Sequence, residues 1–161
     1  MRRWTAPLAA LAVLAFAAPA AAGSASVEPI AVSSRPITQF RIGSAEKMFG
    51  PLEFAGGLEM TAPVRDFGAL SAFRFLEPGA AFIGVADTGF WFFGAIEHDE
   101  AGRPSSVAGF RMQPMVDASG KAIAKKWEVD AEGLAVKDGI ATVGFERNHR
   151  IAEFRIDPNF G

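Results

Sequence analysis

The chain has 161 residues, of which half are hydrophobic and 21% are charged. This composition suffices for one globular domain with a substantial core and excludes a disordered or low-complexity chain. No cysteine is present, which excludes disulfides, thiolate metal sites and a cysteine nucleophile.

The first segment has the features of a secretory signal peptide. Arg2 and Arg3 give a positive start, an apolar run begins at Pro7, and small residues precede Gly23. The run is shorter than the ~20 residues that a membrane span needs, so no membrane insertion is expected after cleavage. We predict a signal peptide at residues 1–22 and a periplasmic or secreted protein. Export by the general secretory route is favoured over twin-arginine export.

The charge balance argues against a nucleic-acid partner. Without Arg2 and Arg3, the chain has 14 basic against 18 acidic residues, a formal charge of −4. Lys125-Lys126 is the nearest approach to a basic run, and no Lys/Arg cluster interleaves with aromatic residues. We therefore predict that the protein does not bind nucleic acid.

Two weaker strand signals precede the main pattern. Residues 23–36 contain few large apolar side chains and predict an extended leader, followed by one domain over residues 37–161. Residues 37–42 alternate polar and apolar side chains, which predicts a strand. Residues 52–62 predict a second strand, bent at its Gly-Gly pair because glycine within a strand usually marks a bend.

Two later stretches repeat one pattern of strands. The strands expected in the first copy are residues 69–76, 81–87, 90–98 and 107–114. The strands expected in the second copy are residues 132–136, 140–146 and 149–156. Asp138-Gly139 is a strong hairpin signal, and the copies align with Leu70 opposite Leu134 and Asp87 opposite Glu146. The aromatic run Phe90–Phe93 is expected to pack both faces of its strand into the core.

Repeated four-stranded antiparallel units are typical of a β-propeller, in which each unit is one blade. A propeller closes with 4 to 8 blades, whereas this chain has about two and an N-terminal strand pair. We predict an all-β fold of β-propeller-like repeats that is incomplete and truncated in the second blade. The open sheet edges would then be covered by remaining propeller blades or by self-association.

Four motifs of the repeat resemble one family in their order and spacing. They are FGALSAFRF from Phe67, VADTGFWF from Val85, DAEGLAV from Asp130 and GFERNHRI from Gly144. With these motifs the chain resembles the N-terminal part of the bacterial phytase-like propeller family, described as having the esterase-like activity of phytase. The resemblance implies an exported hydrolase of small phosphoester or carboxyl-ester substrates, and it admits Ca²⁺ as a cofactor.

Two motifs depart from the family pattern. Residues 68–72 read Gly-Ala-Leu-Ser-Ala, where the family more often has Gly-Gly-Leu-Ser-Gly. Residues 86–89 read Ala-Asp-Thr-Gly, where it more often has Ser-Asp-Arg-Gly. The second change removes a hydroxyl and a cation that could help to bind an anionic substrate.

Carboxylates stand at corresponding places of the two copies. Asp87 and Glu146 end the second strand of each copy, and Glu132 opens the first strand of the second copy. Because loops at one face of a propeller converge on its axis, these groups are expected to gather there. Carboxylate oxygens suit a hard cation such as Ca²⁺, so Asp87, Glu132 and Glu146 are predicted metal ligands. The alternative is structural: Asp87 caps a turn and Glu146 pairs with Arg147 or Arg150.

The same end of the second copy offers acid–base groups. Glu132, Glu146 and His149 are predicted catalytic residues, because carboxylates and imidazoles exchange protons with reacting groups near neutral pH. Arg147 is predicted to bind the substrate anion. A histidine in a polar turn is, alternatively, a surface residue without a role. Ser71 lies in no G-x-S-x-G elbow, so it is not expected to be a nucleophile.

Two functions from different classes remain. The leading interpretation is an exported phytase-like or esterase-like hydrolase with a divalent metal at the channel mouth. The alternative is a non-catalytic periplasmic propeller module that binds a glycan or a protein. Propellers serve both purposes, so the fold leaves open whether the protein is an enzyme.

Overall fold

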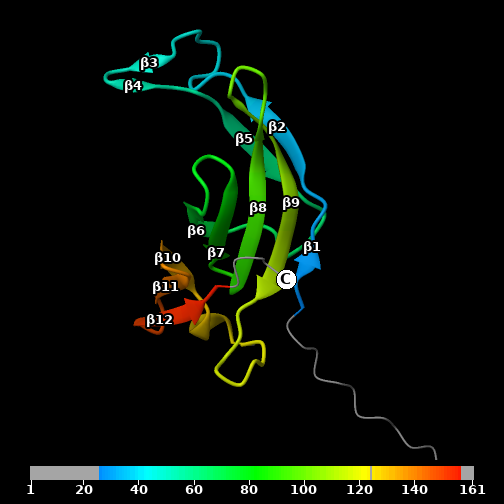
Figure 1. The fold of residues 1–161 in the computed structure, drawn as a ribbon, viewed down its shortest axis with the longest axis vertical. Coiled ribbons are helices and arrows are strands. Elements are labelled where there is room, and N and C mark those ends of the chain that lie inside the picture. Colours follow the sequence, from blue (N-terminus) through cyan, green and yellow to red (C-terminus); the bar gives the residue numbers. More distant parts are fainter. Residues whose placement is uncertain (1–25, 124, 157–161) are drawn as a thin grey trace, which may run out of the picture.

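The computed structural model describes residues 26–123 and 125–156, so the predicted signal peptide lies outside the described residues. This part of the chain forms twelve β-strands and one short 3-10 helix, η1 (Lys126–Glu128). The strands form separate antiparallel sheets, none of them closed (Figure 1). The predicted all-β, incomplete propeller-like fold is confirmed. Within the described ranges, no helix has the length and apolar character needed to cross a membrane.

The first sheet contains the predicted four-stranded meander. Its strand order is β1-β9-β8-β7-β6, so β1 adds a short fifth strand to the outer edge of β9. All of these strands pair antiparallel with their neighbours. The strands are β1 (Glu28–Pro29), β6 (Leu70–Phe75), β7 (Ala81–Ala86), β8 (Phe90–His98) and β9 (Pro104–Pro114).

The second sheet contains the three predicted strands of the second copy in the order β10-β11-β12. Asp138 and Gly139 connect β10 to β11 with φ of 50° and 74°. Positive φ at both residues is the geometry of a tight two-residue hairpin turn, as the Asp-Gly pair predicts. The strands are β10 (Ala131–Lys137), β11 (Ile140–Phe145) and β12 (Arg150–Arg155).

The N-terminal strand pair exists, but its first strand is not where the alternation predicts. The strand ends at Ile37, and residues 38–42 belong to no strand. Phe40 instead packs on Phe49 and Phe54, with ring centroids 4.7 and 5.7 Å away, whereas Ile42 is 99% exposed. The residues predicted as an extended leader supply β1 and most of β2. The strands are β2 (Ser33–Ile37), paired with β5 (Gly57–Thr61), and β3 (Met48–Phe49), paired with β4 (Leu52–Glu53).

The register of the sheets corrects the alignment of the two copies by three residues. Leu70 pairs with Ala86 and Ala131 pairs with Phe145 at the same end of each hairpin, so Leu70 corresponds to Ala131. Leu134 therefore corresponds to Phe73, not to Leu70. The error arises because the first hairpin has a five-residue connection at 76–80 and the second has two residues.

The equivalence of the two strand-end carboxylates is confirmed. The amide of Asp87 donates to the carbonyl of Ala69 at 3.0 Å, and the amide of Glu146 donates to the carbonyl of Asp130 at 2.9 Å. Both hairpins also carry a β-bulge at the next position of strand one, where the register shifts by one residue. Each copy thus begins with the same backbone arrangement.

The main core lies between the two sheets. Trp91 and Phe93 of β8 face the second sheet, and Trp91 meets Phe154 of β12 with ring centroids 5.1 Å apart. Phe92, on the opposite face of β8, joins a second aromatic cluster with Phe82 and Phe110. The aromatic run of β8 therefore fills the core on both faces, as predicted.

Candidate functional site

Three of the predicted site residues line one open depression on the second sheet. Glu132 comes from β10, and Glu146 and His149 come from the turn between β11 and β12. All three side chains are exposed. The depression therefore gathers two carboxylates and one imidazole from chain segments 14 or more residues apart.

The floor of this depression is bare backbone. Gly133 and Gly144 pair across β10 and β11. A Cβ added to Gly144 would have only the Cα of Gly133 within 4 Å, at 4.0 Å. Because no side chain covers the two glycines, a flat group can approach the main chain between Glu132 and Glu146.

A β-bulge places Glu132 at the rim. The register of β10 against β11 shifts between Ala131 and Gly133, which leaves Glu132 as the extra residue. A bulge re-aims the side chain of the extra residue and is common beside functional sites. Ser71 takes the same position in the first sheet, where its hydroxyl donates to the carbonyl of Ala69 at 3.2 Å.

Arg147 does not line the depression, because an ion pair holds its side chain. Its Nε lies 2.7 Å from Oδ2 of Asp130. The Asp130 side chain is 6% exposed, whereas that of Arg147 is 63% exposed. Sequence reasoning missed Asp130. It opens the DAEGLAV motif, but its burial depends on packing that the motif does not encode.

Arg150 lines the depression but also has partners elsewhere. Its Nη2 donates to the carbonyl of Glu128, and its guanidinium lies over the Phe145 ring, with Cζ 3.8 Å from the centroid. No ion pair joins Glu146 to Arg147 or Arg150 in the described part of the chain. The predicted structural pairing of Glu146 is therefore not formed.

Asp87 lies apart from the other predicted ligands, at the corresponding turn of the first sheet. Its Oδ2 is 4.0 Å from Nζ of Lys126. Its Oδ1 is buried and has no hydrogen-bond partner among the described residues, and the same holds for Oγ1 of the adjacent Thr88. Asp87 contributes nothing to the depression formed by Glu132, Glu146 and His149.

The described residues contain no group of three or more His, Asp or Glu side chains that could hold a metal ion. Asp87, Glu132 and Glu146 thus form no ready-made calcium site here. Calcium binding stays a prediction.

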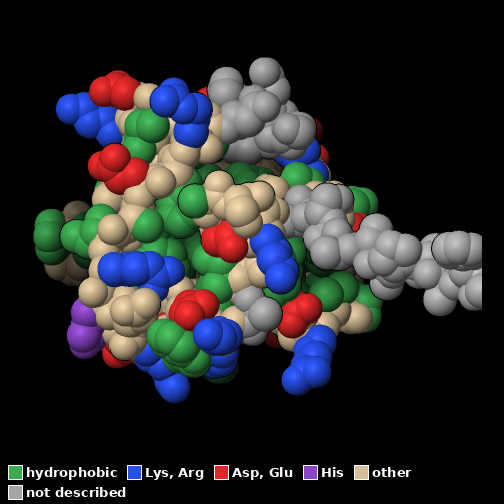
Figure 2. Space-filling model, turned by 90° about the horizontal axis from the view of Figure 1, so that it is seen from below, with side chains coloured by type: hydrophobic (Ala, Val, Ile, Leu, Met, Phe, Trp, Pro, Cys, Tyr) green, Lys and Arg blue, Asp and Glu red, His purple; other side chains and the backbone are tan. Residues whose placement is uncertain are grey.

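Charges of both signs are mixed over the end of the molecule seen in Figure 2. Acidic and basic side chains alternate there around apolar ones, and neither sign forms a continuous patch. The depression itself has two carboxylates against the one guanidinium of Arg150. With His149 as the imidazolium these charges sum to zero, and with His149 neutral the depression is net negative. In neither state does it offer the excess of positive charge that would attract a dianionic group, whereas an uncharged group does not need one.

The residues of the depression suit acid–base chemistry. A carboxylate can take a proton from water, and an imidazolium can give one to a leaving group. The open glycine floor leaves room for the plane of an ester between these groups. The arrangement is thus suited to adding water to a polar, uncharged bond.

The fold is that of an all-β protein of propeller-like sheets, and this exposed depression is its candidate acid–base site. The sequence model of the family described as phytase-like, with the esterase-like activity of phytase, matches residues 65–160. This match covers more than half of the chain, and the chain belongs to that family. No curated protein and no solved structure matches the chain.

Proposed function

We propose that this phytase-like protein hydrolyses carboxyl esters at the depression lined by Glu132, Glu146 and His149. The observation that carries the proposal is the convergence of these three side chains over the Gly133–Gly144 floor. The family description names an esterase-like activity, which agrees with this chemistry.

Carboxyl esters are favoured over phosphoesters because of the charges. Two carboxylates border the depression, and the two nearby guanidinium groups already have partners: Arg147 pairs with Asp130, and Arg150 contacts Glu128 and Phe145. A phosphoester would need several free cations around its oxygens, whereas the depression offers only the His149 imidazolium beside the two carboxylates. An uncharged ester needs none for binding.

The proposed reaction assigns one role to each group. The Glu146 carboxylate removes a proton from a water molecule while the oxygen of that water molecule adds to the carbonyl carbon of the ester. His149, as the imidazolium, protonates the departing alkoxide, so the products are a carboxylic acid and an alcohol. The Glu132 carboxylate, on the other side of the floor, would accept the second hydrogen bond of that water molecule.

We also propose that the protein acts outside the cytoplasm, after loss of residues 1–22. The positive start, the apolar run and the small residues before Gly23 support this location. N-terminal sequencing of the mature protein, expressed in a bacterium with its own leader, tests it. A first residue at Gly23 is expected, and a retained Met1 in the cytoplasmic fraction would contradict export.

Saturable hydrolysis of p-nitrophenyl acetate tests the proposed activity. Removal of a general acid or base typically lowers the rate 10²- to 10⁴-fold, so Glu146→Gln and His149→Asn should each lower kcat at least 100-fold. His98→Asn is the matched control, because this exposed histidine ends β8 and lies outside the depression. Glu153→Gln is the control for the carboxylate.

Equal loss in the control variants would reveal non-specific surface catalysis and contradict the proposal. Absence of saturable turnover in a folded wild-type chain would contradict it as well and would favour the non-catalytic binding module. Circular dichroism of each variant confirms that the fold is intact.

A further inference from the structure

The outer edge of β12 carries backbone groups that pair with no described strand. Within the second sheet β12 pairs only with β11. The amide of Ile156 donates to the carbonyl of Gly139 at 2.9 Å, and bonded pairs alternate along an antiparallel ladder. The N–H and C=O groups of Ile151, Glu153 and Arg155 therefore point to the open edge.

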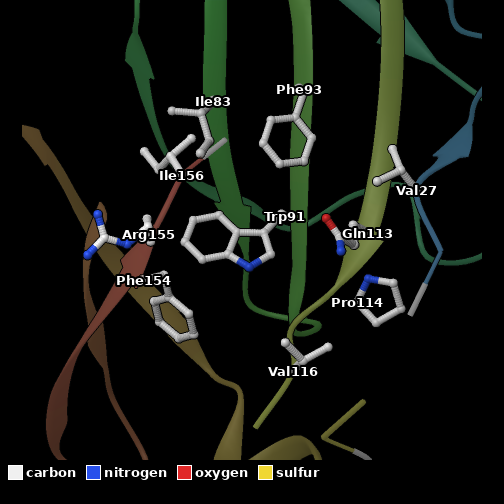
Figure 3. Close-up of a pocket in the computed structure, with 10 residues that line it drawn as sticks. All are labelled: Val27, Ile83, Trp91, Phe93, Gln113, Pro114, Val116, Phe154, Arg155 and Ile156. Carbon is white, nitrogen blue, oxygen red and sulfur yellow. The ribbon is translucent and has the colours of Figure 1, made fainter. Parts of the chain in front are cut away.

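A mainly apolar pocket of about 270 Å³ adjoins this edge and is lined by both sheets. In Figure 3, Trp91 lies at its centre, with Phe154 of β12 on one side and Gln113 and Pro114 of β9 on the other. Small-molecule sites usually have ~300–1,000 Å³. A volume below this range favours inserted side chains over a larger ligand.

The first sheet shows what occupies the corresponding place. There β8 is the counterpart of β12, and β9 pairs with its outer edge. Phe110 and Met112 of β9 are 4% and 3% exposed and pack with Phe92 of β8. Phe92 of β8 corresponds to Ala152 of β12, because Phe92 pairs with Gly84 of β7 in the same way as Ala152 pairs with Val143 of β11. The two side chains therefore point to the equivalent face of each sheet. Two large apolar side chains beside β12 would thus point into the pocket.

A second copy of the chain does not fit this edge through its own β12. Phe154 of that copy would also pack on its own Trp91, 5.1 Å away. Its first sheet would then occupy the space in which β8 and β9 already border the pocket. The edge can therefore accept a strand that is not itself covered by a second sheet on the side facing the pocket.

We propose that the open edge of β12 and the adjoining pocket bind an extended polypeptide strand antiparallel to β12. Backbone hydrogen bonds to Ile151, Glu153 and Arg155 would hold the strand. Alternate apolar side chains would enter the pocket against Trp91 and Phe154. The partner is an extended segment with large apolar residues at every second position.

A peptide that copies residues 104–114 of β9 is the probe. Labelled with a fluorophore, it should bind the full chain with a saturable rise in anisotropy. The same peptide with serine at the positions of Phe110 and Met112 should bind at least tenfold more weakly. This comparison leaves the protein unchanged, so it does not depend on how any variant folds.

Two further measurements locate the bound peptide. The variant Glu153→Pro removes one outward N–H and should weaken binding at least tenfold, whereas Glu153→Gln should not. Amide exchange followed by NMR should show new protection at Ile151, Glu153 and Arg155. Peptide binding without this protection, equal binding of the two peptides, or no binding at millimolar peptide would each overturn the proposal.

Discussion

Arg147 and Asp130 form an ion pair that ties the turn after β11 to the start of β10. The Nε–Oδ2 distance is 2.7 Å, and Asp130 is the buried partner. The main chain of the same residue accepts the amide of Glu146 at 2.9 Å. Asp130 therefore anchors the turn that carries Glu146 and His149.

Truncation of the exposed partner should destabilise the protein, because it leaves a buried carboxylate without its cation. Arg147→Ala should lower the free energy of unfolding by about 2 kcal/mol, measured by urea denaturation. The double variant Asp130→Asn/Arg147→Ala should lose less than the sum of the single changes. Strict additivity of the two single changes would contradict a coupled pair.

Ala69 is the residue whose replacement should stabilise the fold. It has φ of 48°, a left-handed conformation that costs a non-glycine residue ~1–2 kcal/mol. Ala69→Gly relieves this cost, partly offset by the greater freedom of glycine in the unfolded chain. We expect a gain of about 0.5–1 kcal/mol and a melting temperature a few degrees higher.

The control for this prediction is Ala135→Gly, at an exposed position within β10. Ala135 is not among the non-glycine residues with positive φ. Its replacement should lower stability by about 0.5–1 kcal/mol. If both substitutions shift the melting temperature in the same direction, the left-handed conformation of Ala69 is not the cause.

Gly84 is required by the packing of the first sheet. A Cβ at this position would lie 2.0 Å from Cζ of Phe92, a buried ring. Gly84→Ala should therefore cost about 1–3 kcal/mol as the core is forced apart. Gly144→Ala, with only the Cα of Gly133 within 4 Å, should cost clearly less. Thermal melts followed by circular dichroism compare the two, and equal losses would contradict the packing argument.

Asp99 should make stability depend on pH under acidic conditions. The Arg103 side chain donates to its Oδ2 at 2.8 Å and the Arg103 amide donates to its Oδ1 at 2.9 Å, which lowers the pKa of Asp99. In the unfolded chain this carboxyl has an ordinary pKa of about 3.9. At a pH between the two pKa values the unfolded chain therefore binds more protons than the folded chain. The contribution of Asp99 is therefore present above about pH 4 and is lost as the pH falls through the lowered value.

The variant Asp99→Asn tests this sign. Its melting temperature should be lower than that of the wild type at pH 7, and the difference should shrink as the pH falls below 4. Glu100→Gln, an exposed neighbour, serves as the control. A difference that grows toward low pH would show that the sign is wrong.

Local signals in the sequence predict most of the sheet structure. Apolar runs mark β7 and β8, and patterns of apolar and polar side chains mark the other strands from β6 to β12. Asp138-Gly139 marks the second hairpin because both residues accept positive φ. The strand at residues 33–37 is different, because its partner β5 is distant in sequence and its own residues, Ser-Ser-Arg-Pro-Ile, do not alternate as residues 37–42 do. Alternation alone does not say which of the two segments finds a partner.

The candidate site could be predicted only in part. Equivalent strand ends identify Asp87 and Glu146, but they do not show that Glu132 and His149 meet Glu146 while Asp87 lies elsewhere. The burial of Asp130 depends on its neighbour Val129, which packs on Gly89 of the other sheet. Such contacts between sheets leave no periodic trace in the sequence.

The most direct measurement compares kcat/KM of the purified wild-type chain for p-nitrophenyl acetate and p-nitrophenyl phosphate. Because Glu132 and Glu146 border the depression and both nearby arginines have other partners, saturable turnover of the acetate is predicted, with kcat/KM at least 100-fold above that of the phosphate. A phosphate ester cleaved as fast as the acetate, or faster, would contradict the proposed ester hydrolysis.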